Sequence, residues 1–103
     1  MPNYPLEGYM SQRITQKDLE AVIARINRIT KSPETSYTKT PEGKLTSNVG
    51  NYHLSGAYGG YNLHRIINEG GGVTCPLGTG HVTKKELYNL MHAFIRGLEA
   101  GKE

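Results

Sequence analysis

Two amphipathic segments, each opened by a helix-capping signal, stand near the two ends of this sequence. In the first, Thr15 is the N-cap and Asp18 takes the third helical position, where a carboxylate completes a capping box. The apolar residues that follow share one helical face: Leu19, Val22, Ile23, Ile26 and Ile29. We expect this helix to begin at Gln16 and to stop before Pro33.

The second amphipathic segment begins with the T-x-x-E capping box of Thr83 and Glu86. Its apolar residues again recur at helical spacing: Leu87, Leu90, Met91, Phe94, Ile95 and Leu98. Gly101 is the expected C-cap. Each helix therefore presents one apolar face that has to be buried against another element.

Between these helices the sequence predicts two β-hairpins. Residues 36–40 and 45–48 flank the turn sequence Pro41-Glu42-Gly43-Lys44. Residues 51–57 and 61–68 flank Tyr58-Gly59-Gly60, in which we expect the two glycines to provide the positive φ angles of a tight turn.

Residues 61–68 also fit a short helix, because Leu63, Ile66 and Ile67 have helical spacing. Glycine clusters on both sides and the short length favour a strand. In a strand, Tyr61 and Arg65 lie on one face and His64 lies on the other.

The element order predicts an α+β fold of two layers, with an N-terminal helix, antiparallel β-hairpins, and a C-terminal helix packed on the sheet. The 103 residues suit a single domain spanning residues 1–103, with residues 1–13 as an extended N-terminal arm. Leu, Ile, Val and Phe together number only 21, a small supply for one core. This favours a homo-oligomer.

The net charge of +3 is a mild basic excess that suits an anionic ligand. Nucleic acid is not the expected partner, because the first helix mixes basic with acidic residues. Cys75 is the only cysteine, so no internal disulfide forms. With no apolar leader and no run of about 20 apolar residues, we expect a cytoplasmic protein without a membrane partner.

Residues 51–72 combine tyrosine, histidine, arginine and asparagine with many glycines, a mixture typical of a binding surface. Tyrosine rings can stack on a base, while arginine and histidine can contact phosphate oxygens. The predicted ligand-binding residues are Tyr52, His53, Tyr58, Tyr61, His64, Arg65, Asn68 and Lys84. The alternative is that the tyrosines pack against the second helix and the histidines hydrogen-bond to the backbone.

Lys84 belongs to this set through the stretch Gly78-Thr79-Gly80-His81, which runs into the start of the second helix. Backbone amides, the helix dipole and lysines can together hold a phosphate. The spacing of a P-loop is missing, and the alternative is a capped helix with solvated lysines.

Catalytic and metal-binding patterns are weak. The four histidines lack the spacing of a metal motif, so we predict neither a metal nor a cofactor. We expect no enzymatic activity. The enzymatic alternative is a phosphodiesterase in which His53 and His64 act as acid and base.

The run GNYHLSGAYGGYNLHRIINEGGGVT, followed by GHVTKKELYNLMHAFIRGLE, resembles a family of small proteins encoded by tailed bacteriophages and prophages. The resemblance covers residues 13 to 99 and assigns no role to individual residues. It implies a phage origin and the cytoplasm of a bacterial host as the place of action. Small phage proteins of this size commonly disarm host systems.

Together, residues and resemblance lead to one hypothesis and one alternative. We expect a non-enzymatic protein that sequesters a small phosphorylated, nucleotide-like molecule, such as a host signal of antiphage defence. The alternative is an inhibitor that binds and blocks a host protein, for example a CRISPR-type complex, because tyrosine and arginine are also common in protein interfaces.

Overall fold

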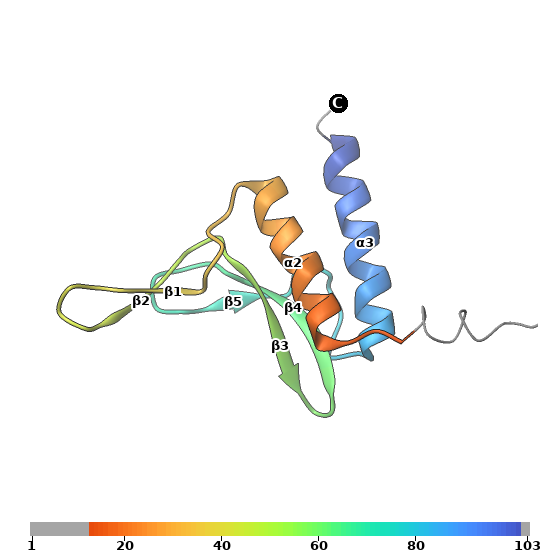
Figure 1. Ribbon diagram of the computed structural model, residues 1–103, viewed down its shortest axis with the longest axis horizontal. Coiled ribbons are helices and arrows are strands. Elements are labelled where there is room, and N and C mark those ends of the chain that lie inside the picture. Colours follow the sequence, from red (N-terminus) through yellow and green to blue (C-terminus); the bar gives the residue numbers. More distant parts are fainter. Residues whose placement is uncertain (1–12, 102–103) are drawn as a thin grey trace, which may run out of the picture.

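Two helices pack against antiparallel β-structure in the computed structural model, which describes residues 13–101 (Figure 1). The elements follow the order α2 (Gln16–Thr30), β1 (Tyr37–Lys39), β2 (Leu45–Ser47), β3 (Tyr52–Ala57), β4 (Gly60–Ile66), β5 (Val73–Thr74) and α3 (Lys84–Gly101). This confirms the predicted α+β arrangement. Nearly all of the predicted N-terminal arm, residues 1–12, lies outside the described residues.

Both helices begin where their capping signals predict. The Thr15 Oγ1 atom accepts the Asp18 N–H at 3.1 Å, and the Asp18 carboxylate accepts the Thr15 N–H at 2.9 Å. At α3, the Glu86 N–H donates to Thr83 Oγ1 at 3.1 Å, and the Thr83 N–H donates to the Glu86 carboxylate at 3.2 Å. The α3 helix runs further than expected, since Gly101 is still helical.

The predicted hairpins are also present. β1 and β2 pair in a two-stranded sheet that extends to one side of the molecule (Figure 1), and β3, β4 and β5 form a second sheet in that order. Residues 60–66 are a strand, which rules out the helical alternative for this segment. The short strand β5 was not predicted from the sequence.

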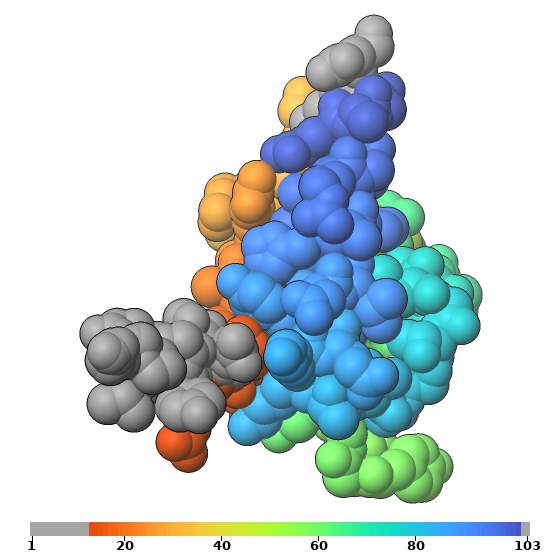
Figure 2. Space-filling model, turned by 90° about the vertical axis from the view of Figure 1, so that its right-hand side faces the viewer, coloured from red at the N-terminus to blue at the C-terminus, as the bar shows by residue number. Residues whose placement is uncertain are grey.

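The turn between β3 and β4 differs in register from the expectation. Tyr58 and Gly59 hold its positive φ angles, of 55° and 74°, so they are the two central residues of the turn. Gly60 instead begins β4 and is needed for space, because a Cβ atom there would lie 3.0 Å from the backbone oxygen of Val82. The turn forms a tip that projects beyond the helices (Figure 2).

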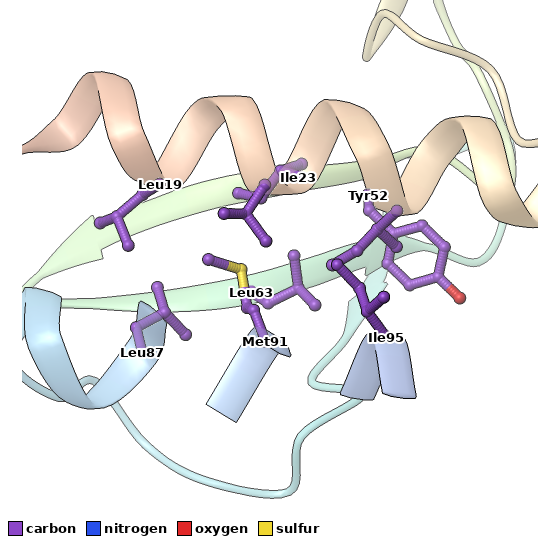
Figure 3. Close-up of a cluster of buried hydrophobic side chains, with 9 residues drawn as sticks. Leu19, Ile23, Tyr52, Leu63, Leu87, Met91 and Ile95 are labelled. Atoms are coloured by element: carbon purple, nitrogen blue, oxygen red, sulfur yellow. The ribbon is translucent and has the colours of Figure 1, made fainter. Parts of the chain in front are cut away.

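The core lies between the two helices and the inner face of the β3–β4 hairpin (Figure 3). Its buried side chains are Leu19, Val22, Ile23, Ile26, Tyr52, Leu63, Leu87, Met91 and Ile95. Because strand side chains alternate between faces, burying Tyr52 and Leu63 on the inner face leaves the residues beside them on the outer face.

Candidate functional site

The outer face of the β3–β4 hairpin carries polar side chains. His53 pairs with His64 across the two strands, and Ser55 pairs with Asn62. Directly opposed residues of an antiparallel pair point to the same side of the sheet. These four side chains therefore share the face turned away from the helices.

Three histidines form a continuous line on this face, which we call the histidine row: His53, His64 and His81. The ring centroids of His53 and His64 are 5.8 Å apart, and those of His64 and His81 are 6.0 Å apart. Tyr58, at the hairpin tip, extends the line, with its ring 5.8 Å from that of His81.

His81 joins the row from the loop before α3, and three contacts fix this loop to the hairpin. The Ser55 hydroxyl and His81 Nε2 are hydrogen-bonded at 3.1 Å. The Asn62 side-chain amide donates to the Thr79 carbonyl at 3.0 Å. Tyr61 and Val82 exchange two backbone hydrogen bonds of 2.8 Å, so the position of His81 is set by the backbone as well as by its ring.

Burial lowers the pKa values of His53 and His64, and a neighbouring histidine lowers each further: His64 acts on His53, and His81 acts on His64. Both effects disfavour the charged imidazole. The two rings are therefore neutral near pH 7. An anion placed among them would favour the charged imidazole and so oppose the effect of the neighbouring histidines.

The tautomer of His53 follows from its neighbour Asn51. The Asn51 amide nitrogen donates to the Pro33 carbonyl at 2.8 Å, which identifies the side-chain oxygen as the atom that faces His53. This oxygen lies 3.3 Å from His53 Nδ1, so Nδ1 is the protonated nitrogen. Protonation of the ring then adds a donor at Nε2.

The structure divides the predicted ligand-binding residues between two faces. Tyr52 lies on the helix side, where the residue is 5% exposed and its ring contacts Phe94 edge-on. Arg65 stacks its guanidinium 5.0 Å from the Tyr52 ring centroid and donates to the Gly50 carbonyl at 3.2 Å. Tyr52 and Arg65 therefore contact each other on the helix side of the hairpin, away from the histidine row.

The remaining predicted residues also fall into separate places. Lys84 holds its ammonium 5.6 Å from the ring centroid of Tyr61, on the helix side near the tip. Asn68 lies in the turn after β4, where its side-chain oxygen accepts the Gly72 N–H at 2.9 Å. Of the predicted set, only His53, His64 and Tyr58 lie along the histidine row, where His81 links Tyr58 to His64. Tyr52 pairs with Arg65, and Tyr61 pairs with Lys84, on the other face.

Ser55 and Asn62 were missed by sequence reasoning, and His81 was noted only as part of an anion-binding loop. The signal for Ser55 was present, because it lies two residues after His53 on a strand and so shares its face. The approach of His81 depends on the path of a loop that the alternation of strand residues does not predict.

The side chains of the histidine row are not arranged to hold a metal ion. Among residues 13–101, no three His, Cys, Asp or Glu side chains are arranged to hold one metal ion. Within the same residues, no helix combines the length and apolar character needed to cross a membrane.

Comparisons with protein-family models, with curated proteins and with solved structures found no match.

Proposed function

We propose that this protein binds and sequesters a small phosphorylated, nucleotide-like molecule, whose phosphate contacts the histidine row and whose ring stacks on Tyr58. The observation that supports this most directly is the unbroken line of three imidazoles and one exposed phenol on a single face. The proposal assigns the protein no chemical step, since holding the ligand is enough to remove it from solution.

The electrostatics of the row support an anionic ligand. The pKa values of His53 and His64 are lowered by burial and by other histidines, and no carboxylate of the described residues offsets these effects. A phosphate would attract protons onto the rings and accept charge-assisted hydrogen bonds from them. Affinity is therefore expected to rise as the pH falls toward 6.

Tyr58 is suited to stacking because its side chain is 97% exposed and its backbone is held in a two-residue turn. Stacking of a base on an aromatic ring contributes about 1–3 kcal/mol. The distance from the Tyr58 ring to the row lets one ligand span both, with the ring at the tip and the phosphate over the histidines.

The biological setting that we propose is a phage-infected bacterial cell, with the protein in the cytoplasm and a nucleotide signal of antiphage defence as the ligand. We also propose a homo-oligomer, because the apolar content is small and a neighbouring subunit would add walls to the row.

Thermal denaturation at pH 6.0 and pH 8.0 tests the ligand proposal, with inorganic phosphate and a panel of linear and cyclic nucleotides as probes. We expect at least one nucleotide to raise the melting temperature, and to do so more at pH 6.0. The rise should disappear in His64→Gln and shrink in Tyr58→Asn, a replacement that tolerates the positive φ angle at this position.

Two control variants separate this site from other surfaces. Arg65→Ala changes the helix side and His92→Gln changes an imidazole that contacts Tyr88 edge-on in α3, so both should retain the ligand response. Loss of the response in Arg65→Ala but not in His64→Gln would move the site to the helix side. No nucleotide response, together with a stable complex with a host protein, would favour the inhibitor alternative. Hydrolysis of the nucleotide would favour the phosphodiesterase alternative.

A further inference from the structure

Among residues 13–101, no strand pairs with the outer edge of β3. The backbone hydrogen bonds of two β4 residues show the direction of the N–H and C=O groups along this strand. Ile66 bonds to Gly50 and Asn51, on the β3 side, whereas Tyr61 bonds to Val82, on the opposite side. Hydrogen bonding alternates along an antiparallel pair. The N–H and C=O groups of Tyr52, Leu54 and Gly56 therefore point away from β4, toward the open edge.

Elsewhere in the sheet, asparagine side chains hydrogen-bond to backbone groups that lack a neighbouring strand. Asn27 of α2 accepts the Tyr52 N–H at 2.9 Å and donates to the Tyr52 carbonyl at 3.0 Å. Asn62 accepts the Leu63 N–H at 2.8 Å, on the side of β4 that lacks a strand at this point. Within residues 13–101, no side chain takes this role for Leu54 or Gly56.

A groove runs along this edge between α2 and β3. Its volume is about 290 Å³, and Ile23 and Ala24 of α2 contribute to its lining beside Leu54. Since α2 runs antiparallel to β3 (Figure 3), Glu20 lies toward the Gly56 end, whereas Glu34 belongs to the segment after α2 at the other end.

The groove is acidic although the chain as a whole is basic. Glu20 and Glu34 are both exposed, and neither carboxylate has an ion-pair partner within residues 13–101. Two carboxylates near the ends of a groove that Ile23, Ala24 and Leu54 line in part favour a ligand that combines apolar side chains with positive charges at its flanks.

We propose that the groove binds an extended basic peptide segment of a partner protein, which adds to β3 as a further strand. Its backbone would exchange hydrogen bonds with Leu54 and Gly56, the addition mode known for exposed sheet edges. Side chains opposite these two residues would enter the groove over Ile23 and Ala24, and Lys or Arg residues at the two ends would meet the carboxylates. Asn27 limits the added strand, because it already occupies the edge at Tyr52.

A basic peptide fits this edge better than a second copy of the chain. Pairing two β3 edges around a twofold axis would bring two acidic grooves together, and like charges across an interface oppose association. The peptide site meets the proposed ligand site at His53, which belongs to the histidine row and also lines the groove. His64, His81 and Tyr58 do not line the groove, so variants at these residues test the ligand proposal without changing the groove.

Selection from a displayed library of random ten-residue peptides tests the proposal, with wild-type protein as the bait. We expect enriched peptides to carry Lys or Arg on both sides of three or four residues of high β-propensity. In an NMR titration, a synthetic copy should shift the amide signals of Leu54 and Gly56 most. Gly56→Pro should weaken its binding at least tenfold, because it removes an N–H that points out of the sheet and adds a ring to the edge.

Gly56→Ala is the matched control for this variant, because it keeps the N–H and its Cβ would meet only ordinary contacts of 3.9 Å. The double variant Glu20→Lys, Glu34→Lys should also weaken binding tenfold or more, whereas Glu42→Lys, in the β1–β2 turn, should not. No enrichment, or equal binding by Gly56→Pro, would overturn the proposal. A dimer of the free protein that dissociates in Gly56→Pro would assign the edge to a second copy and overturn it as well.

Discussion

Asn27 connects α2 to the hairpin that carries the histidine row, and its replacement by alanine is the sharpest test of this architecture. The side chain is 2% exposed and makes two hydrogen bonds to the backbone of Tyr52, itself 5% exposed. Asn27→Ala removes both partners and leaves a buried donor and a buried acceptor unsatisfied. The expected loss comes from these two groups rather than from lost apolar contact.

The size of the loss follows from the count of orphaned groups. Each buried polar group left without a partner costs about 1–3 kcal/mol. Alanine returns roughly 0.5 kcal/mol through its higher helix propensity. We expect the free energy of unfolding to fall by about 3 kcal/mol, which lowers the melting temperature of a domain of this size by roughly 12–24 °C.

Urea denaturation followed by circular dichroism measures this loss, with Asn89→Ala as the control. Asn89 is an exposed asparagine of α3, so its replacement should be neutral or slightly stabilising. The reasoning would be refuted by a loss below about 1 kcal/mol for Asn27→Ala, the value of a single hydrogen bond to water-accessible backbone.

Asn27→Asp adds a pH dependence that a purely structural defect would lack. A carboxylate can accept the Tyr52 N–H but cannot donate to the Tyr52 carbonyl, and burial raises its pKa above the unfolded value of about 3.9. Relative to wild type, this variant should therefore be most stable at low pH and should lose stability as the pH rises through the raised pKa. A loss that is the same at pH 4 and pH 8 would contradict this account.

Two further predictions concern the row and the loop beside it. The pKa values of His53 and His64 are lower in the folded protein than the usual value of about 6.5, so the unfolded chain binds more protons just below this pH. The free energy of unfolding, measured by urea titration without ligand, should have its full value above pH 6.5 and should decrease as the pH drops through 6.5 toward the folded pKa values. A flat profile would contradict the burial of the rings. Gly60→Ala should cost about 1–3 kcal/mol, because its Cβ would press on the backbone of His81 and Val82. Gly97→Ala is its control in the same thermal scan, because the added Cβ would meet no described atom within 4 Å apart from its chain neighbours and the backbone of its own helix.

The helices were the most predictable part of the fold. Their starts depend on contacts between residues three positions apart, such as Thr15 with Asp18, and these are visible in the sequence. The end of α3 was less predictable. Glycine is only favoured at a helix end, and Gly101 is still part of α3.

The hairpins were predictable as elements, but the sequence did not show how the predicted ligand-binding residues divide between the two faces of the sheet. The alternation of a strand already separates His64 from Arg65, and the structure follows it. What the sequence left open is which face meets the helices. That choice depends on burying Tyr52 and Leu63 together, which requires the pairing of two strands and the packing of two helices at once.

Buried amides explain how a chain with so few large apolar residues holds the β3–β4 hairpin in place. Asn27, Asn51 and Asn62 are each at most 2% exposed, and each bonds to backbone atoms of a neighbouring segment. A side-chain amide has the donor and acceptor of a peptide group, so it can substitute for a missing strand where an apolar residue cannot. Because these bonds are directional, they set the position of the histidine row as well as stabilising the fold. It follows that Asn27→Ala should weaken the proposed ligand binding by the row even at temperatures where the variant is still folded. An apolar deletion of equal cost, such as Leu87→Ala, should leave that binding closer to wild type.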